Sequence, residues 1–158
     1  MKPRIDLSHI SPAAYKAVLG VEQYVQGNVD RTILHLVKIR ASQINGCAYC
    51  IDMHTKDARA AGETEQRIYA LDAWRETPFY SDKERAALEL TEAVTLIREG
   101  HVPDAVFEEA RAHFNEAEIV NLTLSIATIN LWNRLAITLR SVPGEYQPGK
   151  QHPASAVA

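Results

Sequence analysis

The spacing of apolar residues restricts the fold of this chain more than any other feature. Apolar side chains recur every three or four positions, as in Ile33, Leu36 and Val37, which is the period of a helix with one buried face. No segment shows the sustained alternation of apolar and polar residues that a half-buried strand requires. With 158 residues, 46% of them hydrophobic, the chain is expected to be all-α, a single-domain bundle of six to seven helices over residues 1–141. Residues 142–158, with three prolines and two glycines, are expected to be a loose tail.

Capping residues, glycines and prolines divide this pattern into separate helices. Pro12 suits the first turn of a helix and Ser11 its N-cap, while Ser81 and Glu84 have the spacing of a capping box. Glycine closes helices because it tolerates positive φ. The expected helices run from Pro12 to about Asn28, Asp30 to Asn45, Cys47 to about Ala61, Thr64 to just before Pro78, Ser81 to Gly100, Pro103 to about Phe114 and Asn115 to Leu139.

The last expected helix is the longest and has apolar residues almost all the way round. Its uncharged stretch, Ile119–Asn133, is too short to cross a bilayer and contains polar residues. Such a helix lies either at the centre of the core or against another subunit. Asn130, Asn133 and Arg134 share one of its faces and are expected to satisfy backbone or partner groups.

The charge distribution argues against several classes of partner. The net charge is -3 and the sequence pI about 6.1, and the Lys and Arg residues are scattered, so there is no basic surface for nucleic acid or an anionic membrane. The first ten residues carry charges and no apolar run, unlike a secretory signal. A cytoplasmic protein is therefore expected.

Both cysteines of the chain, Cys47 and Cys50, lie three residues apart, and His54 follows four residues later. On a helix these three side chains share one narrow stripe. A thiol at a helix start ionises readily because the unpaired backbone N–H groups favour the thiolate, and an imidazole can accept a thiol proton near neutral pH. In a chain without an export signal, this pattern favours redox chemistry or metal binding over a structural disulfide framework.

Two other interpretations of the cluster stay open beside redox chemistry. His35 lies twelve residues before Cys47, and with Cys47, Cys50 and His54 it could complete a tetrahedral zinc set. The protein would then be a zinc-stabilised helical binding module. Alternatively, the cysteines are inert packing residues of a helical assembly protein.

Three stretches, Lys38–His54, Ala73–Leu88 and Ile129–Ala136, resemble the alkylhydroperoxidase D-like branch of the carboxymuconolactone decarboxylase family. The resemblance implies an all-helical subunit that assembles into trimers or hexamers, and a dithiol peroxidase that needs neither metal nor haem. It also implies a small hydroperoxide substrate, reduction by a dihydrolipoyl group on a partner protein, and electron transfer to a peroxiredoxin. The muconolactone decarboxylase activity of the family is a further alternative, although that reaction does not call for a vicinal dithiol.

The resemblance also assigns roles to individual residues. Cys50 matches the peroxidatic cysteine, Cys47 the resolving cysteine, which closes a redox-active disulfide, and His54 the histidine of the proton relay. Two positions depart from the family pattern. His35 stands where the relay has a glutamate, and Tyr49 stands where a histidine separates the cysteines. A histidine can still relay a proton, but unlike a carboxylate it is partly cationic near neutral pH.

Overall fold

The computed structural model describes residues 2–149, and the regular structure within them consists of helices without a strand. The predicted all-α, single-domain fold is therefore confirmed. In chain order the elements are α1 (Leu7–Ile10), α2 (Pro12–Asn28), α3 (Arg31–Asn45), α4 (Ala48–Ala60), α5 (Glu65–Ala70), the 3-10 helix η1 (Leu71–Glu76), α6 (Asp82–Thr95), α7 (Asp104–His113) and α8 (Glu116–Leu139).

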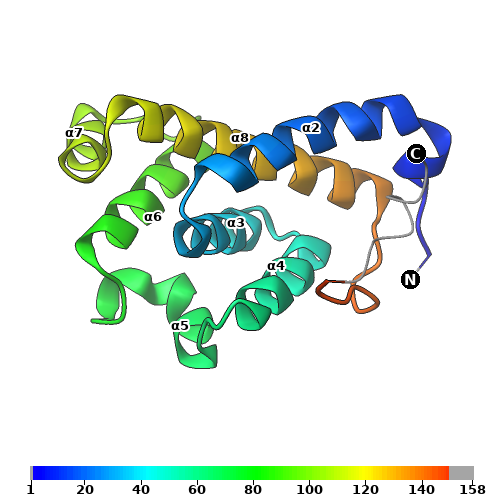
Figure 1. Ribbon diagram of the computed structural model, residues 1–158, viewed down its shortest axis with the longest axis horizontal. Helices are drawn as coiled ribbons and strands as arrows, with labels where there is room; N and C mark the ends of the chain where they lie inside the picture. The colour runs from blue at the N-terminus through cyan, green and yellow to red at the C-terminus, as the bar shows by residue number, and fades with distance from the viewer. Residues whose placement is uncertain (1, 150–158) are drawn as a thin grey trace.

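Helix α3 lies in the middle of the molecule and contacts α4, α6 and α8. Helices α2 and α8 run side by side across one side of it, and α6 with α5 borders it on the other (Figure 1). Most of α3 is buried, including Leu36, Val37 and Ile39. Each buried side chain of this size stabilises the fold by about 1.5–3 kcal/mol, so α3 organises the core.

Two apolar clusters make up most of that core. One joins α3, α6, α7 and α8, with Val37, Leu90 and Ile126 among its members. The other joins α3 to α5, η1 and α6 around Leu36 and Trp74. A third, smaller cluster lies between α3, α4 and α8, and it contains both cysteines. The dithiol is thus built into the interior rather than on a surface loop.

Local capping chemistry explains most of the helix boundaries. Asp30 caps α3 by accepting hydrogen bonds from the N–H groups of Thr32 and Ile33, at 3.0 and 3.1 Å. The capping boxes at the starts of α6 and α8, led by Ser81 and Asn115, both form. Ser11 does precede α2, but its side chain makes no capping hydrogen bond.

The predicted number of helices was wrong, since the described residues contain eight α-helices and one 3-10 helix. Helix α1 is one short turn, capped by Asp6, without a buried residue, so it leaves no apolar periodicity in the sequence. The helix expected after Thr64 is divided into α5 and η1, which has a non-helical residue at Ala73. Helix α6 ends at Thr95 instead of Gly100, because Leu96 has left helical geometry with φ -95 and ψ 33.

The segment that follows α8 is attached to α4 in its described part. The Lys56 ammonium donates to the carbonyl oxygens of Gly144 and Tyr146, at 3.2 and 3.1 Å, and the Gly144 N–H donates to the Asp52 carboxylate at 2.9 Å. The expectation of a loose tail therefore does not describe these residues, which lie beside α4 in Figure 1. The rest of the expected tail, 150–158, lies outside the described residues.

Helix α8 combines a buried face with an exposed apolar one. Ile126 and Ile129 are fully buried, whereas Val120 exposes 65% of its surface and Ile137 49%.

Of the helices within residues 2–149, none is sufficiently long and apolar to cross a membrane.

Candidate functional site

The site begins at the turn between α3 and α4. Gly46 closes α3 in the left-handed conformation, with φ 68, and the N–H of Cys47 then donates to the Ser42 carbonyl at 2.9 Å. Cys47 is consequently the N-cap of α4, not its first helical residue as predicted. Its sulfur accepts a hydrogen bond from the Cys50 N–H at 3.4 Å, which is the bond that an oxygen of Ser, Thr, Asp or Asn usually makes at this position.

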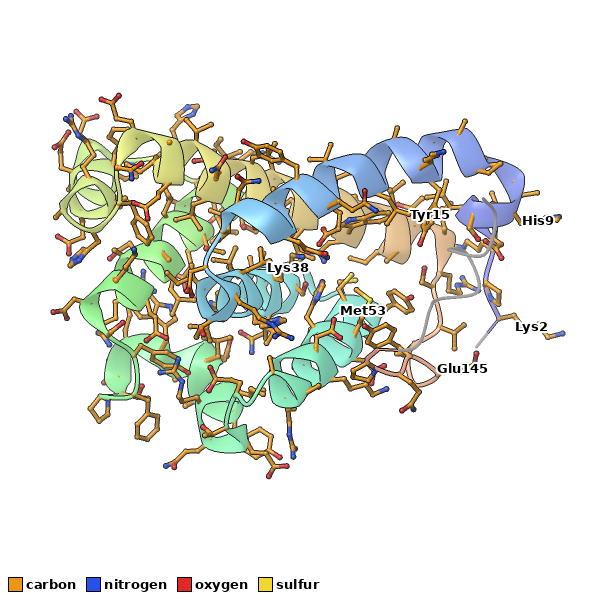
Figure 2. All side chains as sticks on the ribbon, viewed as in Figure 1. Lys2, His9, Tyr15, Lys38, Met53 and Glu145 are labelled. Carbon is orange, nitrogen blue, oxygen red and sulfur yellow. The ribbon has the colours of Figure 1, made fainter. Side chains whose placement is uncertain are left out.

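Both thiols are free and buried, and each cysteine exposes 1% of its surface. Ile129 and Ala136 of α8 pack against them from one side. Tyr49 and Trp132 cover the cluster at its edge, and the Trp132 ring meets Tyr15 of α2 edge to face with centroids 5.7 Å apart. Figure 2 shows Tyr15 directed from α2 toward this part of α8.

The two thiols share one proton unequally. The hydrogen bond from Cys50, together with the backbone N–H groups of Cys50 and Tyr49 and the side-chain amide of Asn133, lowers the pKa of Cys47 to about 7 despite its burial. The same hydrogen bond, burial and the neighbouring charge raise the pKa of Cys50. Within this hydrogen-bonded pair, the thiolate is therefore favoured on Cys47 over Cys50.

His54 follows Cys50 by one turn of α4 and exposes 5% of its surface. Burial lowers the pKa of His54 well below its usual range, and the positive charge of Lys38 and the ring of His35 act in the same direction. The imidazole is therefore neutral at pH 7. Among the described residues its Nε2 atom is buried without a hydrogen-bond partner, so this nitrogen is available to accept a proton.

A buried ion pair lies beside His54. Lys38 of α3 is 3% exposed and pairs with Glu22 of α2, which also accepts a hydrogen bond from the Gln26 amide at 2.8 Å. Figure 2 shows Lys38 near the centre of the molecule. Burying an ammonium is costly unless it is paired, so Glu22 stabilises the buried Lys38 side chain, and the positive charge of Lys38 lowers the pKa of His54.

His35 faces the same region from α3. Burial lowers its pKa, while the Asp57 carboxylate opposes this effect. Asp57 of α4 also has its Oδ2 atom 3.9 Å from Nδ1 of His54, and its Oδ1 atom accepts a hydrogen bond from the Tyr146 hydroxyl at 2.6 Å. The carboxylate of this region is therefore supplied by Asp57, whereas the resemblance places a glutamate at position 35.

Tyr49 cannot replace a histidine as a base. Burial is the main reason why the pKa of Tyr49 rises to about 12, and the nearby Tyr15 and Cys50 add to the effect. Its phenol stays protonated near neutral pH, so its contribution is an apolar ring over the dithiol and a hydroxyl group that can donate.

The four side chains of the zinc hypothesis do not form a metal site. Within residues 2–149, no group of three or more His, Cys, Asp or Glu side chains is arranged so that it could hold a metal ion. Cys47, Cys50, His54 and His35 do not make up such a group, so the arrangement of the described residues gives the zinc-stabilised binding module no support.

Comparisons with known proteins agree with this arrangement. The sequence profile of the Carboxymuconolactone decarboxylase family matches residues 12–93, more than half of the chain, and these residues include both cysteines and His54. The chain belongs to the carboxymuconolactone decarboxylase family. Its resemblance to the alkylhydroperoxidase D-like branch is confirmed by structural neighbours of that kind.

Three proteins illustrate what the chain is similar to. The uncharacterized protein YdfG of Bacillus subtilis is 50% identical over 140 residues, which are 88% of this chain and 95% of that protein. ATU0492 of Agrobacterium tumefaciens, a protein of unknown function provisionally assigned to antioxidant defence as AhpD, has a TM-score of 0.89 and 47% identity, covering 92% of this chain and all of that one. A peroxidase-related AhpD-core protein of Ralstonia eutropha JMP134 has a TM-score of 0.77 at 21% identity, covering 88% and 74%, and shows the shared fold alone.

Several residues of the site were not singled out from the sequence. Lys38 lies between the buried residues Val37 and Ile39, which is a local sign of a buried charge. Val21 and Gln23 beside Glu22 are exposed and give no such sign. Asp57 and Tyr146 are 89 positions apart, and nothing in the sequence links them. Asn133 was assigned to a polar face of the last helix, but its position beside the thiols depends on how α8 packs on α4.

Proposed function

We propose that this member of the family is a dithiol peroxidase, in which Cys50 attacks a hydroperoxide and Cys47 resolves the product to a disulfide. The observation that carries the proposal is the thiol pair at the start of α4, with its charge on Cys47 and a neutral, buried His54 one turn beyond Cys50. A nucleophile, a second thiolate and a base are thus within one stretch of helix.

The first step needs a base because Cys50 holds the shared proton. His54 accepts that proton, and the Cys50 thiolate attacks the terminal oxygen of the hydroperoxide. An S–O bond forms, the O–O bond breaks, and the alkoxide leaves with the proton from His54. Cys50 is oxidised to a sulfenic acid and the hydroperoxide is reduced to an alcohol. The Asp57 carboxylate, 3.9 Å from the imidazole, stabilises the transient positive charge.

The second step uses the low pKa of Cys47. Its thiolate attacks the sulfur of the Cys50 sulfenic acid, the S–S bond forms, and hydroxide leaves as water after it takes up a proton. A dithiol then returns two electrons and two protons and becomes a disulfide itself. We propose a dihydrolipoyl group on a partner protein as this reductant and a peroxiredoxin as a further electron acceptor. No resident metal or other cofactor is required by these steps, and a cytoplasmic location suits the reduced state of the thiols.

A turnover assay tests the proposal. The reduced protein is mixed with an organic hydroperoxide and dihydrolipoamide, and loss of the hydroperoxide is followed. We expect Cys50→Ser to abolish turnover, whereas Cys47→Ser should still react once and leave a sulfenic acid on Cys50 that a selective reagent traps. His113→Ala, a change in the last turn of α7, serves as the control and should keep full activity. Undiminished turnover in Cys50→Ser would contradict the proposal.

Association into a trimer or hexamer is also a proposal. Val120 of α8 and Phe107 of α7, both exposed, border an apolar groove of about 550 Å³, and Leu131 and Ile137 are further exposed apolar residues of α8. Contiguous exposed apolar surface marks protein interfaces. A monomeric mass in sedimentation equilibrium at micromolar concentration would contradict it.

A further inference from the structure

We propose that Asn133 of α8 is a catalytic residue whose side-chain N–H group stabilises the thiolate of the dithiol. Asn133 is fully buried and lies between Ile129 and Ala136, four residues after the first and three before the second. Residues at this spacing share one face of a helix, and both neighbours pack against Cys47 and Cys50. The amide of Asn133 therefore faces the thiols.

The orientation of this amide decides its effect. An asparagine side chain can turn over and exchange its oxygen for its NH₂ group, and the orientation depends on its hydrogen-bond partners. With the NH₂ group toward the sulfur atoms, the amide donates to the thiolate. If the amide oxygen faced the sulfur atoms instead, its partial negative charge would repel the thiolate.

The first constraint on Asn133 comes from Ser42. The Ser42 hydroxyl donates its hydrogen to the Lys38 carbonyl at 2.7 Å, so its oxygen can only accept a further hydrogen bond. Nδ2 of Asn133 lies 3.0 Å from that oxygen and donates to it. Ser42 is also the residue whose carbonyl receives the N–H of Cys47, so the serine, the thiol and the amide belong to one corner of the fold.

The second constraint comes from Asn130 and Asn45. Asn130 donates from its amide to the Ile126 carbonyl at 2.9 Å, and its Oδ1 atom accepts from the Arg134 guanidinium at 2.9 Å. Both partners have fixed roles, since a carbonyl only accepts and a guanidinium only donates. Asn45 consequently presents Nδ2 to Asn130 Oδ1 at 2.9 Å, and the same nitrogen donates to Asn133 Oδ1 at 2.9 Å.

These two constraints agree on one orientation. The oxygen of Asn133 is held by Asn45 and one N–H by Ser42, which leaves the other N–H directed at the sulfur atoms. The side-chain hydrogen bond from Asn133 lowers the pKa of both cysteines, in accord with this placement. Asn133 touches the reacting sulfur, whereas Ser42 and Asn45 act through it and are positioning residues. A catalytic role for Asn133 rests on the proposed function, but its effect on the thiol pKa can be measured without a peroxide.

The test is a titration of the thiolate by its ultraviolet absorbance in the reduced protein. A hydrogen bond to a charged group is typically worth about 1.5–3 kcal/mol, so Asn133→Leu, which keeps the volume and removes the donor, should raise the lower thiol pKa by about one unit or more. Asn133→Asp should raise it further. The matched control is Asn121→Leu, the same substitution three turns earlier on α8, where the side chain accepts from the Tyr24 hydroxyl at 3.1 Å, and it should leave the thiol pKa unchanged.

A measurement on the unmodified protein keeps the inference testable if the variants at position 133 do not fold. The side-chain amide resonances of Asn133 should shift with the same midpoint as the thiolate absorbance, and those of Asn130 should not. An unchanged thiol pKa in folded Asn133 variants, an equal rise in Asn121→Leu, or an Asn133 amide that does not follow the titration would overturn the inference. A normal titration in a protein without peroxidase turnover would instead overturn the proposed function alone.

Discussion

At the scale of single residues, the site works by assigning charge. Hydrogen bonds from Cys50 and from the backbone lower the pKa of Cys47, the pairing with Cys47 raises the pKa of Cys50, and burial and the nearby Lys38 lower the pKa of His54. Lys38 itself pairs with Glu22 inside the protein. In the proposed mechanism, His54 is the neutral base that takes the proton from Cys50.

Buried His54 and half-buried His35 make stability depend on pH. Burial lowers the pKa of His54 and His35 below the value of about 6.5 that a histidine has in the unfolded chain. Below that pH the unfolded chain binds more protons than the folded protein, so stability is present above about pH 6.5 and is lost as the pH falls. Each such histidine can contribute a slope of at most about 1.4 kcal/mol per pH unit.

Urea unfolding between pH 7.5 and pH 5 measures this dependence. We expect a constant free energy of unfolding in the upper part of the range and a progressive loss in the lower part. His54→Gln, which has no titrating group, should have a shallower slope than the parent even if it is less stable overall. Equal slopes in the two proteins would show that His54 is not held neutral in the folded state.

At the scale of elements, the turn between α3 and α4 positions the dithiol. Its geometry could be predicted because it is local: Gly46 closes α3 with the expected positive φ, and the two cysteines lie at the start of α4. The hydrogen-bond partners of the site could not be predicted, because they come from other elements. Asn133 reaches the thiols from α8, and Tyr146 reaches Asp57 from beyond α8.

Replacing Gly46 tests the importance of the turn. No atom lies within 4 Å of the position of an added Cβ, so Gly46→Ala meets only the strain of φ +68. That strain costs about 1–2 kcal/mol for a residue other than glycine, and we expect a loss of this size in the free energy of unfolding. The control, Gly20→Ala, fills an exposed helix position with equally open space and should stabilise the protein by about 0.5–1 kcal/mol. Equal effects of the two changes would contradict the assigned role of the turn.

At the scale of the whole molecule, the helical pattern of the sequence predicted the fold class and most helix starts. It did not indicate which helix is central. The apolar residues of the last helix favoured a core or interface position, yet the most buried helix is α3, and α8 keeps an exposed apolar side. The periodicity of a sequence shows how much of each helix is apolar. The packing of the folded chain determines which other helices cover that apolar surface.

The most direct test of the proposed peroxidase is the fate of the two thiols under mild oxidation. The reduced protein is treated with one equivalent of an organic hydroperoxide, and free thiols and peptide masses are measured after unfolding. We predict that both thiols of each chain are lost together in an intramolecular disulfide between Cys47 and Cys50, and that Cys50→Ser retains its remaining thiol. Thiols that survive the treatment, or that oxidise without forming this disulfide, would contradict the central claim.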